Sequence, residues 1–289
     1  MTRRQNPAAA LLWMLLSCAL LAGVAAFGRY TALSGLPSSQ IVFLRVFFGL
    51  MTMMPLLLVR GPDLMRTKQL NVYIVRVMIS MVAMSTWFAA LAYITVGEMT
   101  AISFLTPILA TMGAAFFLRE VVNVHRWAAT LLGLVGALVI LRPGVVELGI
   151  GPWLALASAL AAAGSTLFIK RLTNLDDPDR VVFLTTLMQT PLALIPALFV
   201  WTWPSSDVWL CTMAMGLLGT FGHVCMSRAF ASGDASLVMG MDFSRLPFAV
   251  LYGFLLFGEL IDFWTWAGAG IIFMASLYGA HHARKSKRS

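Results

Sequence analysis

Charged side chains in the middle of long apolar stretches are the residues of this sequence best suited to do chemistry. Asp242 and Arg245 lie three residues apart in one such stretch, so on a helix they share a face and can pair with each other. The pair could fill a packed interface, or Arg245 could bind the carboxylate of a small molecule while Asp242 holds the guanidinium in place. We expect the second role, because apolar residues would be cheaper for packing alone.

A second group of candidates follows helical spacing in the stretch that starts near Val72. Ser80, Met84 and Trp87 would lie on one face, which suits a wall that grips an apolar or aromatic group. Ordinary helix packing explains the same spacing equally well. Arg76 lies near the start of this stretch and could bind substrate or extend its charged end towards the membrane surface.

His223 lies in another apolar stretch and could act as a proton carrier, although a lone histidine is more often a neutral hydrogen-bonding residue. Arg45 has the same apolar surroundings and could extend its charge towards the membrane surface or hold a helix end. Pro107 and Pro247 each remove a backbone hydrogen bond from a helix, which predicts a hinge or gating role or a kink that serves packing.

The sequence lacks the marks of an enzyme or of a metal or cofactor site. The three cysteines have no CxxC or Cys/His spacing, and neither an HExxH nor a GxSxG motif occurs. Asp176, Asp177 and Asp179 lie together in a polar loop beside Lys170 and Arg171, as expected for a solvated loop. We therefore predict no catalytic residues, no metal and no cofactor.

The elements that position the candidates must be membrane-spanning helices. The chain has 289 residues, of which 60% are hydrophobic and 11% charged. Its apolar runs recur at roughly the 20 residues that a helix needs to cross a bilayer, and they do not alternate as barrel strands do. We predict an all-α integral membrane protein with ten spans. These spans start near Ala8, Ser38, Val72, Met99, Trp127, Gly149, Val181, Asp207, Ala235 and Phe263.

The net charge of +8 is explained by membrane orientation and not by nucleic acid. If the N-terminus is cytoplasmic, nearly all basic residues outside the spans fall in inner loops and tails, and Arg29 and Arg142 are the exceptions. The apolar run after Arg3 and Arg4 is too long for a signal peptide, so we expect an uncleaved first helix. We predict a multi-pass protein of the cell (inner) membrane with both termini cytoplasmic.

The chain resembles itself at an offset of about 136 to 140 residues. The matched pairs keep their order along the chain, and they include Trp13 with Trp153, Val42 with Val182, Pro107 with Pro247, Glu120 with Glu259, and Gly133 with Gly270. We predict one five-helix repeat over residues 1–145 and a second over 146–289. An odd number of spans inverts the second repeat, which is the arrangement that supports alternating access to a site at the bilayer midplane.

Several motifs resemble the drug/metabolite transporter superfamily in its ten-helix, EamA-type form. They are FAALAY at 88–93, EMTAISFLTP at 98–107, FLRE at 117–120, Arg142-Pro143 and LFGE at 256–259. The resemblance covers essentially the whole chain. It implies a central cavity built from the first, third, fourth, sixth, eighth and ninth spans, and it favours a structural role for Arg45. The motifs specify the superfamily without the substrate.

We therefore expect a secondary transporter of a small metabolite, with an amino acid as the first choice and export as the more typical direction. The alternatives are uptake or exchange of an organic anion or nucleoside-like metabolite, or a membrane scaffold without transport. The predicted partners are a small-molecule substrate and the lipid bilayer. Small residues such as Gly133, Gly136, Gly268 and Ala275 predict either a tight scaffold or the face of a homodimer.

Overall fold

The computed structural model is all-helical in the part of the chain that it describes, residues 7–106, 108–109, 124–141, 149–173, 175–232, 242–260 and 262–286. The α-helices are α1 (Pro7–Leu33), α2 (Ser38–Arg60), α3 (Leu70–Ala90), α4 (Val96–Ser103), α6 (Val124–Leu141), α7 (Ile150–Thr173), α8 (Pro178–Phe199), α9 (Ser206–Ser232), α11 (Arg245–Phe257) and α12 (Phe263–Ser286). Two 3-10 helices, η1 (Pro62–Met65) and η2 (Asp242–Ser244), complete the set.

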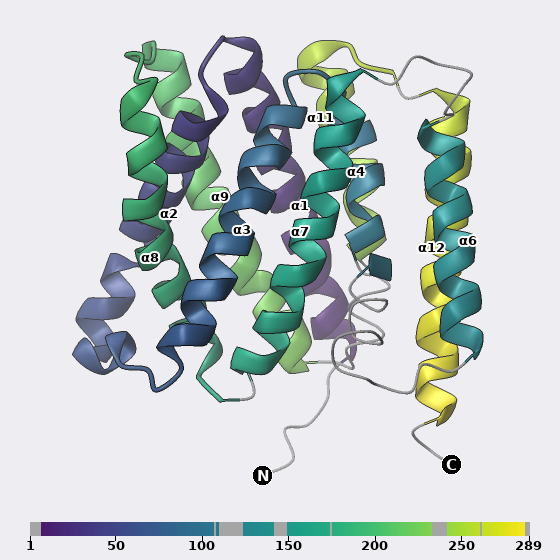
Figure 1. Cartoon of the computed structure of the whole chain (residues 1–289), viewed down its shortest axis with the longest axis horizontal. Coiled ribbons are helices and arrows are strands. Elements are labelled where there is room, and N and C mark those ends of the chain that lie inside the picture. Colours follow the sequence, from purple (N-terminus) through teal and green to yellow (C-terminus); the bar gives the residue numbers. More distant parts are fainter. Residues whose placement is uncertain are drawn as a thin grey trace.

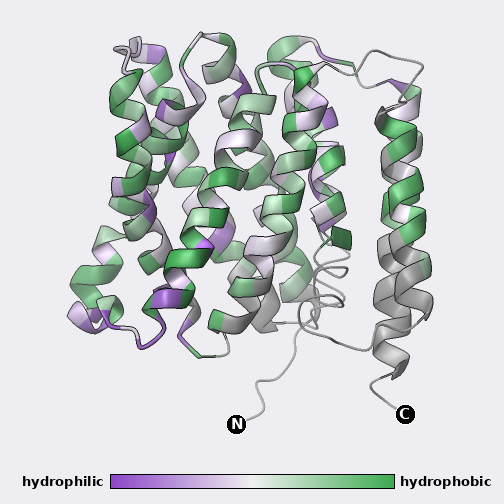
Figure 2. Ribbon diagram, viewed as in Figure 1, coloured by the Kyte–Doolittle hydropathy of each residue, from purple (hydrophilic) through white to green (hydrophobic). Residues whose placement is uncertain are grey.

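These helices correspond in order to the ten spans predicted from the sequence, which confirms the all-α membrane fold. Five of them, α1, α2, α3, α8 and α9, are each long and apolar enough to cross a bilayer. Figure 2 shows hydrophobic residues along most of the helices, with hydrophilic residues at many helix ends and in a few places at mid-height. The predicted boundary near residue 145 falls between α6 and α7, in residues 142–148, which lie outside the described part.

Successive helices alternate in direction, so the two halves enter the bundle from opposite ends (Figure 1). The beginning of α1 and the end of α12 lie at the same end of the molecule, whereas α7 begins at the opposite end. With five helices in each half, this path inverts the second half relative to the first, as predicted.

The two halves interlock by exchanging neighbours. Helix α1 packs mainly on α9, and its counterpart in the second half, α7, packs mainly on α3, the counterpart of α9. The helices α2 and α8 pack on each other, as do α4 and α11, and α6 and α12. This pattern is a pseudo-twofold arrangement, and most of the buried surface therefore lies between the halves.

Helices α6 and α12 form a pair along one edge of the molecule (Figure 1). A Cβ atom added to Gly136 would lie 2.8 Å from the carbonyl oxygen of Gly268, and one added to Gly268 would lie 2.5 Å from the carbonyl oxygen of Gly136. Contacts this short leave room only for glycine. These small residues therefore serve packing within the chain, the scaffold role of the two that we predicted, and the predicted homodimer stays a prediction.

One end of the bundle is closed by a network around Glu259, which follows the left-handed cap Gly258 of α11. One carboxylate oxygen of Glu259 accepts from Arg29 Nε of α1 at 2.9 Å, and the other accepts from the backbone N–H of Val96 at 3.1 Å. Arg29 also donates to the carbonyl of Leu91 at 2.5 Å. Because Val96 begins α4, the carboxylate also neutralises the positive end of that helix dipole.

Candidate functional site

Helix α3 turns one face to the outside and one to the interior. Ile74, Val75, Met78 and Val82 are exposed, as expected of side chains that face lipid. Ser80, Met84 and Trp87 are half-buried on the other side of the helix. The inward face predicted from their spacing is therefore present, while their contact with substrate stays a prediction.

Helix α8 completes this face with buried polar side chains. Arg76, only 9% exposed, donates to the hydroxyl of Thr185, and Gln189 Nε2 donates to Ser80 Oγ at 2.8 Å. Arg76 therefore does not extend towards the membrane surface but is held in the interior between α3 and α8. Sequence reasoning missed Thr185 and Gln189, although a glutamine in an apolar span was a readable signal.

Trp87 lies where several helices meet. Its ring packs against the cluster formed by Ala22 of α1, Val96 of α4 and Ala249 of α11. It contacts Phe88 edge to face, with 4.9 Å between the ring centroids. Its Nε1 donates a hydrogen bond to Ser103 Oγ at 3.4 Å. The indole is thus oriented by a polar contact at one edge and remains half-buried.

Asp242 and Arg245 form an ion pair, with side chains 29% and 24% exposed. The sequence predicted both residues on one face of an α-helix, whereas in the described residues a 3-10 turn passes into an α-helix between them. Asp242 belongs to the 3-10 helix η2, and Arg245 is the first residue of α11. Cys18 of α1 contacts this turn, with its Sγ 3.8 Å from the carbonyl oxygen of Asp242.

His223 lies half-buried in α9, next to the position where α1 and α9 are bonded. The hydroxyl of Ser17 donates to the carbonyl of Gly222 at 2.8 Å. The positive charges of Arg45, Arg245 and Arg76 all act on His223. The proton-carrier role of His223 stays a prediction.

Arg45 was expected to be structural, but it belongs to this interior group. Its Nη1 lies 3.4 Å from the sulfur of Met84, and its guanidinium lies beside Gly219 of α9. Arg45 therefore extends from α2 between α3 and α9 towards the side chains described above.

Of the two predicted hinge prolines, Pro247 is among the described residues. Pro107 lies outside the described residues. Pro247 is exposed in the first turn of α11, where a missing N–H is tolerated. A hinge at Pro247 stays a prediction.

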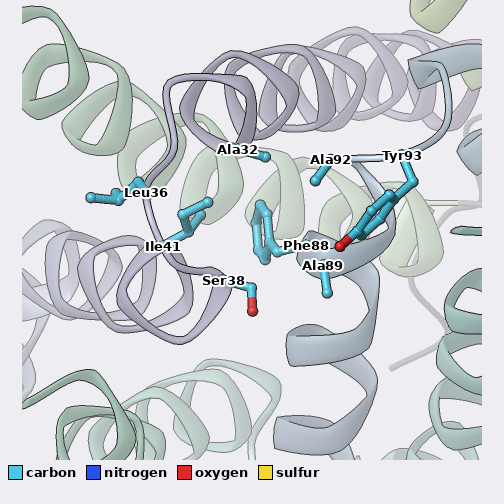
Figure 3. Close-up of a pocket in the computed structure, with 8 residues that line it drawn as sticks. All are labelled: Ala32, Leu36, Ser38, Ile41, Phe88, Ala89, Ala92 and Tyr93. Atoms are coloured by element: carbon cyan, nitrogen blue, oxygen red, sulfur yellow. The ribbon is translucent and has the colours of Figure 1, made fainter. Parts of the chain in front are cut away.

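A pocket of 160 Å³ lies apart from these residues (Figure 3). It is lined by Ala32, Leu36, Ser38, Ile41, Phe88, Ala89, Ala92 and Tyr93. The lining contains no charged group and none of the predicted site residues, so we place the candidate site at the interior polar residues instead. Within the described residues, no group of histidine, cysteine and carboxylate side chains could hold a metal ion.

The model of the EamA-like transporter family matches residues 8–142 and again residues 149–278. The chain belongs to this family. The two EamA matches fit a duplicated repeat, and family membership makes the chain a multi-pass membrane transporter and not an enzyme.

Several curated EamA-type relatives span nearly the same length. A riboflavin transporter from Vibrio cholerae is 30% identical over 292 residues, covering 100% of this chain and 98% of its own. An S-adenosylmethionine uptake transporter from Rickettsia prowazekii is 24% identical, covering 88% and 86%. A pseudopaline exporter from Pseudomonas aeruginosa is 26% identical, covering 84% and 86%.

A crystal structure of another protein superposes with a TM-score of 0.67 at 17% identity, covering 98% of this chain and 99% of that chain. At this identity the likeness supports the EamA fold alone. None of the relatives named above is an amino-acid exporter, so the amino-acid preference drawn from the sequence gains no support from them.

Proposed function

We propose that this chain carries riboflavin, or a heteroaromatic metabolite of similar shape, across the cell membrane by alternating access. The observation that carries the proposal is the 30% identity to a riboflavin transporter along the whole chain. This substrate class corresponds to the nucleoside-like alternative and replaces an amino acid as the first choice.

The chemistry of the interior fits such a substrate. Trp87 offers a flat aromatic surface that is half-buried and oriented by Ser103. Heteroaromatic rings stack on such surfaces with favourable energies. Ser80 and Gln189 add hydroxyl and amide groups near the same face of α3, and these can bond to ring carbonyls and to a sugar-like chain.

An amino acid remains the second candidate because of one observation. The Asp242–Arg245 pair presents both charges side by side, and a zwitterion could bind by exchanging partners with them. Transport of amino acids and not of riboflavin would favour this candidate.

The interlocked, inverted halves support alternating access, since two pseudo-equivalent halves can exchange which end is open. The charge bias of the loops supports cytoplasmic termini. The direction of net transport then follows the gradient and any coupling.

Uptake into proteoliposomes tests the proposal directly. Purified protein should give saturable riboflavin accumulation that protein-free liposomes lack and that excess unlabelled riboflavin inhibits. As a matched pair, Trp87→Ala should abolish most of this uptake, whereas replacing Trp203, which is 83% exposed, by alanine should not. Parental protein that moves a panel of amino acids but no flavin would overturn the proposal.

A further inference from the structure

Three arginines on three different helices have buried Nε atoms in the described part of the bundle. Arg45 of α2 reaches between Met84 of α3 and Gly219 of α9. Arg76 lies two turns before Met84 on α3, and Arg245 lies at the start of α11. His223 follows Gly219 by one turn on α9, and the charges of all three arginines act on it. We call Arg45, Arg76 and Arg245 the arginine cluster.

The described carboxylates do not neutralise this cluster. Among them, only Asp242 contacts one of the three guanidinium groups, that of Arg245. Arg76 has a neutral hydroxyl as its bonded partner, and Arg45 has a thioether sulfur, which is a weak acceptor. Within the described part of the chain, Arg45 and Arg76 therefore lack an opposite charge.

The guanidinium groups also have unused hydrogen-bonding capacity. The buried Nε atoms of Arg45, Arg76 and Arg245 have no hydrogen-bond partner among the described residues. Placing cations in a membrane interior is expensive unless an anion or polar group compensates, and such residues usually mark a transport path. Packing alone gives no reason to put three there.

We infer that the arginine cluster binds an anionic group of the transported molecule, either a phosphate monoester or a carboxylate. The inference rests on the proposed function for the heteroaromatic part of that molecule. Trp87 would hold the ring while Arg45 and Arg76, the two without a carboxylate, bind the anion. A planar guanidinium can donate two parallel hydrogen bonds to such a group, which neutral cargo cannot accept as strongly.

Gly219 is a positioning residue for this site. A Cβ atom there would lie 3.3 Å from Nη2 of Arg45. Because Gly219 has no side chain, the Arg45 guanidinium fits beside α9 at this point. The methyl group of an alanine would push the guanidinium aside. Gly219→Ala should therefore weaken anion binding in the same sense as loss of Arg45, with a smaller effect.

Flavin fluorescence gives a direct binding assay on purified full-length protein. The probes are riboflavin, riboflavin 5′-phosphate and 10-carboxymethylflavin, which share the ring and differ in charge and in the type of anion. The parent should bind at least one of the two anionic flavins about tenfold more tightly than riboflavin. Arg45→Gln should remove this preference and keep riboflavin affinity within about twofold of the parent. Arg66→Gln, an exposed arginine outside the spans, is the matched control and should change nothing.

The outcomes separate the inference from the proposed function. Two results overturn the inference and leave the proposed function intact. In the first, riboflavin binds to the parent as tightly as both anionic flavins. In the second, the preference for an anionic flavin survives in both Arg45→Gln and Arg76→Gln. If no flavin binds, the proposed function fails and adenosine is compared with adenosine monophosphate in a thermal-shift assay. Stabilisation by the monophosphate alone, lost in Arg45→Gln, then supports the anion site, and its absence overturns it.

Discussion

Arg29 and Glu259 are 230 positions apart in the sequence and form an ion pair of 2.9 Å at one end of the bundle. Their side chains are 13% and 12% exposed, so the pair is largely shielded from water. Through Leu91 and Val96 it joins the ends of α1, α3, α4 and α11. We expect these bonds to break when this end opens for transport.

We therefore predict that Glu259→Gln makes this end of the bundle open more readily. Glutamine keeps the shape but removes the charge that holds Arg29. A cysteine introduced at Ala32 should react with an impermeant thiol reagent several-fold faster in the Glu259→Gln background than in the parent. Asp63→Asn, which alters an exposed ion pair at η1, is the control. Equal labelling rates in both backgrounds would show that the pair does not limit opening.

A double-mutant cycle measures the same contact as stability. Arg29→Ala and Glu259→Ala each leave a mostly buried charge without its partner. Each single variant should therefore lose more than half of the free energy of unfolding that the double variant loses. We expect a coupling energy of about 1–3 kcal/mol from unfolding in detergent. Additive losses would contradict a direct interaction.

Trp87 is predicted to bind the ring of the substrate through its aromatic surface. At equal expression, Trp87→Phe should retain much of the riboflavin uptake, and Trp87→Ala should lower it about tenfold or more, since stacking requires a ring. If both variants transport like the parent, Trp87 serves packing alone.

Arg245 is predicted to bind substrate while Asp242 orients its guanidinium. Arg245→Lys should weaken carboxylate-bearing substrates by about tenfold or more, because an ammonium cannot donate the paired bonds of a guanidinium. Asp242→Ala combined with Arg245→Ala should restore folding more than transport, since it leaves no lone buried charge. A double variant with parental affinity for a carboxylate substrate would make the pair structural.

The glycine contact between α6 and α12 predicts a sharp difference between two neighbouring positions. Gly268→Val places atoms against the carbonyl of Gly136 and should lower the free energy of unfolding by about 1–3 kcal/mol. Gly270→Ala meets nothing within 4 Å and should change it little. Thermal unfolding of both variants in one detergent checks the difference, and similar losses would refute it.

The orientation of the chain is a separate prediction, based on loop charges. Cysteines at Ser34 and Ser205, both exposed between helices, should react with an impermeant reagent added outside cells. A cysteine at Lys285, near the end of α12, should react only after the membrane is opened. The reverse pattern would place the termini outside.

The sequence predicted those features that depend on local periodicity and composition. The order of the spans, the inward face of α3 and the proximity of Asp242 to Arg245 all follow from spacing along one stretch. Contacts between distant helices left no such signal. The neighbours of Arg45 are fixed by where α2, α3 and α9 cross, and the family resemblance, which favoured a structural role, did not show them.

The 3-10 turn η2 was missed for a related reason. Asp242 and Arg245 were placed on one helical face because they lie three residues apart, and this spacing does not distinguish an α-helix from a 3-10 turn. The ion pair of Glu259 with Arg29 joins the two halves of the chain and was not predicted. Periodicity cannot show which ends of two repeats meet.

The exchanged packing of the halves has a consequence for how the protein is made. The chain enters the membrane from its N-terminus, so α1 and α3 are inserted before their main neighbours α9 and α7 have been synthesised. Until α8 follows α7 and supplies Thr185 and Gln189, the inward polar face of α3, with Arg76 and Ser80, must be shielded by lipid headgroups, water or the insertion machinery. A chain that stops after α6 therefore leaves this polar seam without the helices that cover it.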